Sequence, residues 1–276
     1  MFGQTPDPEL IEITKDYYGL DKPILVQYFN WLLNIIRGNL GYSIVGGQAV
    51  SDLMLPRIGN TLLLTATGLL FSVILAFPTG LAAAYNHNTW KDLTLSSITL
   101  VLISIPEFWI GLLYMLIFAV WLGILPTSGY VSLIVNPVGF LRIIFLPALT
   151  VASVQSAQTA RMVRSTALDI MRLDYITLMR SLGVSNKRLM SKHVFKNVLI
   201  PVLTQIGLQA GALMGGVIIV ERVFTYPGLA LLMMRALESR DYPLLQACIM
   251  VFALLFVIIN LVVDMLYCYI NPKVRY

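Results

Sequence analysis

Few residues in this sequence have the types and spacing that catalysis requires. There is no Gly-x-x-x-x-Gly-Lys-Ser/Thr phosphate loop and no His-Glu-x-x-His metal motif, and the two histidines, His87 and His193, stand at the edges of different apolar segments. No serine, histidine and aspartate can be placed together as a nucleophile, its base and the acid that orients the base. The sequence therefore predicts no catalytic residue, no metal site and no cofactor, and the chain is not expected to be an enzyme.

Two acidic residues lie inside long apolar runs. Glu107 follows Pro106 directly, and Asp264 comes four residues after Asn260. A carboxylate at membrane depth is costly to bury, and such residues often serve a function. A coupled ion site is one interpretation. For Asp264, an ion pair with a basic residue near the end of its segment is the other.

The basic residues gather in one polar stretch between apolar segments. Eight Lys and Arg lie between Arg161 and Lys196, whereas charged residues make up only 12% of the chain, about half of the share that is usual in soluble domains. No RNA- or DNA-binding motif surrounds this stretch, so the net charge of +5 indicates membrane topology and no nucleic-acid partner. With 58% hydrophobic residues, the chain is predicted to be an all-α integral membrane protein in a lipid bilayer.

Five apolar stretches are long enough to cross a bilayer as helices, which takes about 20 residues each. They cover residues 61–84, 95–121, 143–160, 198–220 and 244–269. Because Lys and Arg near span ends resist translocation, the loop 161–197 is placed on the cytoplasmic side. Alternation then makes 1–60 an extracytoplasmic segment, 61–269 the transmembrane domain and 270–276 a cytoplasmic tail. On this topology eleven basic residues lie inside and eight lie outside.

The extracytoplasmic segment is expected to hold short helices. Asp7-Pro8 has the residues of a helix start, and Gly19 has the residue that commonly ends one. A second helix is predicted to begin near Asp21-Lys-Pro23 and to carry a broad apolar face with aromatic residues. That face suits the membrane interface or the span bundle; a soluble helical cap is the alternative.

The fourth apolar stretch carries glycines at helical spacing. Gly207, Gly211 and Gly215 recur every four residues and therefore share one helix face. Small residues in this pattern allow the backbones of two membrane helices to approach closely. The pattern predicts that this face packs against a neighbouring helix.

Polar residues inside two of the apolar stretches form a second group. Lipid satisfies no polar group, so these side chains must be shielded by other helices or line a wet path. The group lines a translocation path for a solute, or it forms structural hydrogen bonds between helices, and both interpretations stay open. Its members are Gln155, Gln158, Thr159, Gln205 and Gln209.

Several short motifs occur in a fixed order along the chain. The polar stretch contains Asp174-Tyr-Ile-Thr-Leu-Met-Arg180-Ser-Leu-Gly183, followed by His193-Val-Phe-Lys-Asn197. Around it stand Gly19-Leu-Asp-Lys-Pro23, Leu125-Pro-Thr-Ser-Gly129, Val223-Phe-Thr-Tyr-Pro-Gly228, Arg240-Asp-Tyr-Pro243 and Asn271-Pro-Lys-Val-Arg-Tyr276. Together they resemble the permease subunits of ATP-binding-cassette importers, in the branch that carries dipeptides, oligopeptides, nickel and glutathione-like solutes.

The resemblance implies a role for the polar stretch as a coupling loop, in which Asp174, Tyr175, Arg180 and Gly183 meet an ATPase. A short helix is predicted from residue 169 to residue 182, ended by Gly183, with Ser185 capping the next helix. Such a helix can insert into a groove on a partner and be pushed as a rigid body. The alternative is a solvated loop that only fixes the topology.

The resemblance also implies partners and a place in the cell. The partners would be a second, homologous permease subunit, two cytoplasmic ATP-binding subunits and an extracytoplasmic solute-binding protein, and the protein would be a multi-pass component of the cell inner membrane. Members of the family usually have six spans, with a hydrophobic helix before the part that matches residues 1–60. We therefore expect the DNA directly upstream to encode, in frame, about 20–30 further residues with a hydrophobic span.

The function predicted on these grounds is a permease subunit that forms the path for small peptides or peptide-like solutes, driven by separate ATPases. An ion-coupled secondary transporter is one alternative, although such folds usually show internal repeats and a midplane ion site, and neither is evident in this sequence. A non-transporting membrane scaffold is the other.

Overall fold

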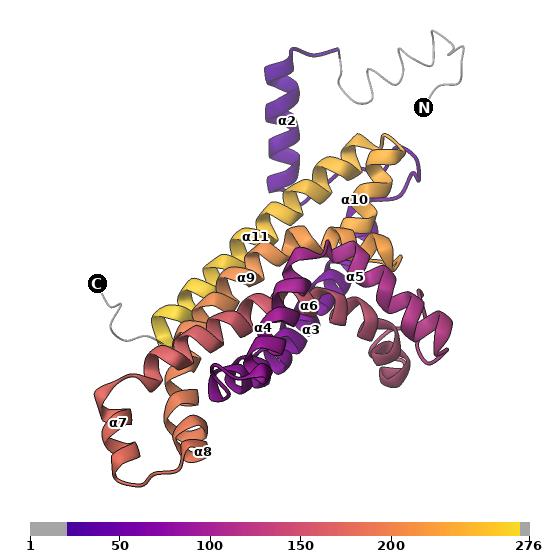
Figure 1. The fold of residues 1–276 in the computed structure, drawn as a ribbon. Helices are drawn as coiled ribbons and strands as arrows, with labels where there is room; N and C mark the ends of the chain where they lie inside the picture. The colour runs from indigo at the N-terminus through magenta and orange to yellow at the C-terminus, as the bar shows by residue number, and fades with distance from the viewer. Residues whose placement is uncertain (1–20, 271–276) are drawn as a thin grey trace.

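Helices dominate the structure. The computed structural model describes residues 21–270. Its elements are α2 (Ile24–Ile36), α3 (Val50–Tyr85), α4 (Trp90–Ser104), α5 (Glu107–Tyr114), the π-helix η1 (Met115–Trp121), α6 (Pro137–Met171), α7 (Asp174–Ser181), α8 (Asn186–Arg188), the π-helix η2 (Leu189–Val194), α9 (Phe195–Val223), α10 (Leu229–Glu238) and α11 (Tyr242–Ile270). Within the described range, the β pairing consists of one isolated bridge between Tyr42 and Ala49. The predicted all-α class is confirmed (Figure 1).

Three helices are long and apolar enough to cross a membrane unbroken, namely α3, α6 and α11. Two further spans exist if each of two bent helix pairs is counted as one. The first pair is α4 with α5 and η1, bent by 107°, and the second runs from α8 through α9, bent by 63° between Gly211 and Gly215. These five positions coincide with the five apolar stretches predicted from the sequence.

The break between α4 and α5 follows from Pro106. Proline lacks the N–H that an α-helix needs at an interior position, and it disfavours helical geometry at the residue before it. Ile105 accordingly adopts extended backbone, with φ −88° and ψ 133°. The second predicted span is therefore two helices joined at a sharp corner.

The bundle is built around α3 and α6, which run in the same direction in close contact. A Cβ at Gly68 would lie 2.7 Å from Cγ1 of Val151, and one at Gly80 would lie 2.5 Å from the carbonyl oxygen of Ala160. Two positions that lack a side chain thus let the helices approach, as small residues do in membrane bundles. α4 and α9 pack against the same pair of helices.

The two ends of the bundle differ. The short helices α7 and α8 project from one end, while α10 and the start of α3 form the other (Figure 1). At the α7 end an apolar cluster includes Ile170, Ile176 and Val198. At the α10 end another cluster includes Met54 and Leu244.

The N-terminal part of α3 extends the first predicted span. The span was expected to begin at residue 61, whereas α3 begins at Val50. Val50 and Met54 are buried against α10 and α11, and this packing holds a turn-rich, more polar sequence in helical form. A hydropathy profile does not include contacts between helices, so it cannot predict this earlier start.

The predicted second helix of the N-terminal segment is present as α2, which follows Pro23 directly. It stands apart from the bundle, and none of its residues is buried (Figure 1). Its apolar residues are thus exposed within the described chain and do not pack into the span bundle, which leaves the membrane interface or a soluble cap as the predicted environments. The predicted helix between Asp7 and Gly19 and the tail after residue 270 lie outside the described residues.

Candidate functional site: the projecting helix and its connections

The polar stretch folds into a short helix that stands off the end of α6. α6 ends at Met171, the chain turns at Arg172 and Leu173, and α7 begins at Asp174. The predicted helix over residues 169–182 is therefore wrong at its start, because residues 169–171 continue α6. Asp174 occupies the first turn of α7, where a carboxylate stabilises the positive end of the helix dipole.

Gly183 ends α7 in the left-handed conformation. Its φ is +85°, and its N–H donates to the carbonyl of Arg180 at 3.0 Å. The N–H of Val184 donates to the carbonyl of Met179 at 3.1 Å, which completes a glycine-type helix stop. Ser185 stands at the N-cap position of α8 as predicted, but its side chain makes no capping hydrogen bond there.

α7 rests on the bundle through one face. Ile176 is fully buried in the cluster that also holds Ile170 of α6 and Leu189 of η2. The hydroxyl of Tyr175 accepts a hydrogen bond of 3.0 Å from Nδ2 of Asn197, which ties α7 to α9. These contacts orient α7 relative to both helices that enter the loop.

The opposite face of α7 is apolar and exposed. Leu178 is 60% exposed, and Leu182, just past the helix end, is 74% exposed. Asp174 and Arg180 are exposed as well. A partner protein would therefore meet leucine side chains bordered by charged groups, the composition that suits insertion into a groove.

The polar residues of α6 and α9 form a hydrogen-bonded contact inside the chain. The hydroxyl of Thr159 donates to Oε1 of Gln209 at 3.0 Å, and Nε2 of Gln209 lies 3.4 Å from Oε1 of Gln158. Thr159 and Gln209 are buried, whereas Gln158 is exposed. The geometry favours the structural interpretation for Thr159 and Gln209, and it leaves Gln158 on an outer face.

The other two glutamines make no such contact. Gln155 is partly buried, and its Oε1 has no hydrogen-bond partner among the described residues. Gln205 is partly buried on α9. Of the predicted path group, only Gln158 has an exposed side chain, although its Oε1 accepts a hydrogen bond from Gln209.

The glycine face of α9 packs against α11 through two of its three members. A Cβ at Gly211 would lie 2.5 Å from Oδ1 of Asn260, and one at Gly207 would overlap Val263. Gly215, in contrast, has open space around it. The chain bends by 63° between Gly211 and Gly215, and the packing role of Gly215 stays a prediction. Gly216 faces Glu107 of α5 instead.

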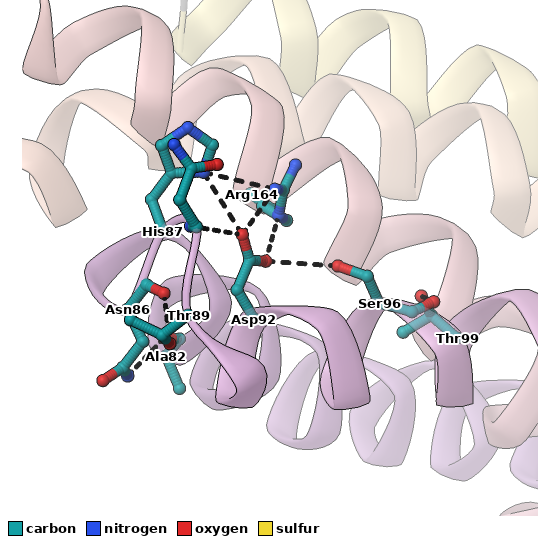
Figure 2. A network of polar contacts seen from close by, with 9 residues as sticks. Ala82, Asn86, His87, Thr89, Asp92, Ser96, Thr99 and Arg164 are labelled. Carbon is teal, nitrogen blue, oxygen red and sulfur yellow. Dashed lines mark hydrogen bonds and ion pairs between the residues drawn. The ribbon is translucent and has the colours of Figure 1, made fainter.

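An ion-pair network that sequence reasoning missed lies near the α7 end of the bundle (Figure 2). Arg164 of α6 and Asp92 of α4 form a bidentate ion pair. Nε donates to Oδ1 and Nη2 donates to Oδ2, both at 2.7 Å. The Asp92 carboxylate also accepts the backbone N–H of Asn88 at 3.1 Å and the hydroxyl of Ser96 at 3.2 Å. Nδ1 of His87 lies 3.2 Å from it.

A second buried carboxylate organises the α10 end. Glu221 of α9 is fully buried; the hydroxyl of Thr61 donates to its Oε1 at 2.5 Å, and the N–H of Leu231 donates to its Oε2 at 2.9 Å. Thr61 in turn accepts the N–H of Leu229 at 2.8 Å. The acid thereby fixes the start of α10 on α3. The sequence offered one signal for this, the Tyr226-Pro-Gly228 turn just after an acid in an apolar run.

The fold and these sites define a polytopic helical membrane protein with broken spans and a short helix that projects from one end. Solved structures of this shape are the membrane subunits of transporters. An inward-facing structure of the MetNI methionine ABC transporter matches with a TM-score of 0.66 at 16% identity, over 79% of this chain and 96% of that one. An amino acid ABC transporter structure solved with histidines matches with a TM-score of 0.58 over 79% of this chain. At this identity the likeness concerns the fold.

The family follows from the sequence comparisons. Residues 76–276 match the family of binding-protein-dependent transport system inner membrane components, and the chain belongs to it. It is 40% identical to the glutathione transport system permease protein GsiC of an Escherichia coli strain, over 99% of this chain and 87% of the relative. The GsiC of Salmonella typhi is 39% identical over the same extent.

Membership defines the chain as a translocation-path subunit of an ATP-binding-cassette importer, a multi-pass protein of the inner membrane. Proteins of this family work together with ATPase subunits and a binding protein. The resemblance inferred from the motifs and the predicted role as a permease subunit of an importer are confirmed. The ion-coupled and scaffold alternatives are not favoured.

Proposed function

We propose that the chain moves small peptides of the glutathione type inward, as one of two homologous permease subunits joined to two cytoplasmic ATPases and an extracytoplasmic binding protein. The observation that carries the coupling part is the exposed leucine face of α7, held at a fixed angle by Ile176 and Tyr175. The substrate part is supported by the relatives at 39–40% identity, which are glutathione transport permeases.

In this proposal α7 is the contact with the ATPase. Leu178 and Leu182 enter a groove on that subunit, and Asp174 and Arg180 border the contact. Burial of two leucine side chains is worth about 3–6 kcal/mol before the costs of association are subtracted. Movement of the ATPases then displaces α7, and α7 displaces α6 and α9, on which it is seated.

The path would run along the outer face of α6 that carries the exposed side chain of Gln158. Gln155, whose Oε1 has no hydrogen-bond partner among the described residues, and Gln205 would belong to the same path. A second permease subunit would close this face and form the other wall. Polar side chains that are costly to leave in lipid would then face the solute.

The contact can be tested by replacing Leu178 with Asp, because a carboxylate in an apolar groove is unfavourable. The ATPase subunits should no longer co-purify with the permease. Ile134, which is 92% exposed in the loop before α6, supplies the control: Ile134→Asp should leave ATPase association intact. Retained association in Leu178→Asp would disprove the assigned contact.

The transport function itself requires reconstitution with all partner subunits in liposomes. Uptake of labelled glutathione should depend on ATP and on the binding protein, and collapse of ion gradients with ionophores should leave it unchanged. Uptake that follows the ion gradient would instead establish the secondary-transporter alternative. Competition by unlabelled dipeptides separates a glutathione-specific path from a general peptide path.

A further inference from the structure

Asp92 joins three parts of the chain at one carboxylate. It accepts from the turn between α3 and α4, from Ser96 within α4 and from Arg164 of α6 (Figure 2). Asp92 is only 5% exposed, and both of its oxygens are bound at 2.7 Å by the guanidinium. A two-pronged pair of this kind fixes the relative orientation of its partners as well as their distance.

Arg164 stands on the same rigid element as the base of α7. It lies seven residues before the end of α6, a rise of about 10 Å along a helix. Two residues then lead into α7, and Ile170 and Ile176 on either side of this turn share one buried cluster. When α7 is displaced, the segment of α6 that carries Arg164 therefore moves with it.

The α4 helix is separated from α5 by a break in the backbone. It stops at Ser104, and the extended residue Ile105 and Pro106 separate it from α5 at an angle of 107°. α5 packs on α6 and α9 at the other half of the bundle, where the hydroxyl of Tyr114 lies 2.7 Å from that of Ser153. The break at Ile105 and Pro106 therefore leaves α4 and α5 as separate elements, and movement of one does not require the same movement of the other.

We propose that the Asp92–Arg164 pair is a positioning contact that makes α4 and the α3–α4 turn move with α6 when the ATPases displace α7. This inference rests on the proposed coupling role of α7. Without the pair, α6 would move and α4 would not follow it fully. The movement of the ATPases would then be transmitted only in part to the spans that line the path.

The first test compares ATP use with transport in the reconstituted complex. Asp92→Asn keeps the shape of the side chain and removes its charge, whereas Arg164→Lys keeps the charge and removes the two-pronged guanidinium. The complex should assemble and hydrolyse ATP in response to the binding protein, while solute taken up per ATP falls about tenfold, within the range in which coupling residues act. Lys91→Gln, which removes an exposed charge from the first turn of α4, next to Asp92, should leave that ratio unchanged.

Two results would overturn the proposal. An unchanged ratio of uptake to hydrolysis in both variants would show that the pair transmits nothing. A loss of assembly, or a fall of hydrolysis and uptake in equal proportion, would show that the pair only stabilises the fold.

The second test measures the distance between α4 and α6 directly. Spin labels on the exposed positions Leu93 of α4 and Ser165 of α6 report the distance between the two helices in the complete complex. That distance should be the same without ATP and with ATP trapped in the wild type, and it should differ between the two states in Asp92→Asn. A change in the wild type would overturn the proposal. Because this measurement does not depend on where the ATPase docks, it is separate from the Leu178→Asp test of the proposed function.

Discussion

The α-carbon of Gly228 lies against the carboxylate of Glu221, so closely that a β-carbon at this position would overlap Oε1. The same carboxylate receives hydrogen bonds from Thr61 of α3 and from the N–H of Leu231 in α10. The glycine of the Tyr226-Pro-Gly228 turn is therefore required by the carboxylate of Glu221, which lies seven residues before it, and the pair fixes the end of the bundle opposite α7.

Replacement of Gly228 by Ala should destabilise the protein by about 1–3 kcal/mol, because the buried carboxylate must shift and lose hydrogen bonds. Thermal unfolding of the purified protein in detergent measures the loss. Gly215 is the matched control, since a Cβ there meets open space, and Gly215→Ala should unfold at the wild-type temperature or above. Equal unfolding temperatures for the two variants would contradict the packing described for Glu221.

Replacement of Gly183 by Val should strain the end of α7 by about 1–2 kcal/mol, because φ is +85° there and a β-branched residue avoids that region. Membrane insertion should survive while ATP-dependent uptake falls. Gly183→Asn is the control, since asparagine tolerates the left-handed region, and it should retain uptake. Normal uptake and normal ATPase association in Gly183→Val would show that the turn is not needed for coupling.

Replacement of Gly211 by Leu should separate α9 from α11, because the side chain would enter the space of Asn260. Yield of folded protein and co-purification of the partner subunits report the effect. Gly215→Leu, on the same helix but beyond the bend, should assemble as the wild type does.

Replacement of Gln209 by Leu should reduce the stability of the protein by about 1–3 kcal/mol, since it leaves the hydroxyl of buried Thr159 without its acceptor.

Cysteine labelling in a background without Cys248 and Cys268 can establish the sidedness. Val45 is 66% exposed in the loop before α3, so Val45→Cys should react with an impermeant thiol reagent in intact cells. Lys91→Cys, in the turn at the α7 end, should react only after lysis. The reverse pattern would invert the topology. Neighbouring Ser43 is unsuitable, because it is buried and its hydroxyl donates to the carboxylate of Asp241.

The features that the sequence predicted well are those encoded by neighbouring residues. The three unbroken apolar helices α3, α6 and α11, and the two bent helix pairs, lie at the five stretches that hydropathy predicted, because a span requires a long run of apolar residues. The clustering of basic residues between Arg161 and Lys196 identified the polar loop, and Gly183 identified the end of its helix, since glycine alone enters the left-handed region without cost. Motif order then pointed to the family that the comparisons established.

Contacts between residues far apart in the chain were decided by the tertiary structure. Asp92 and Arg164 are 72 residues apart, and Thr61 and Glu221 are 160 apart. Each looks in the sequence like a solvated charge or a polar interruption of a span, because composition does not reveal which side chain will neutralise it. The bend after Gly211 and the early start of α3 at Val50 also belong to the features that the tertiary structure decided. A helix in a bundle takes its direction and its ends from the neighbours against which it packs, and those neighbours are chosen by shape and pairing in three dimensions.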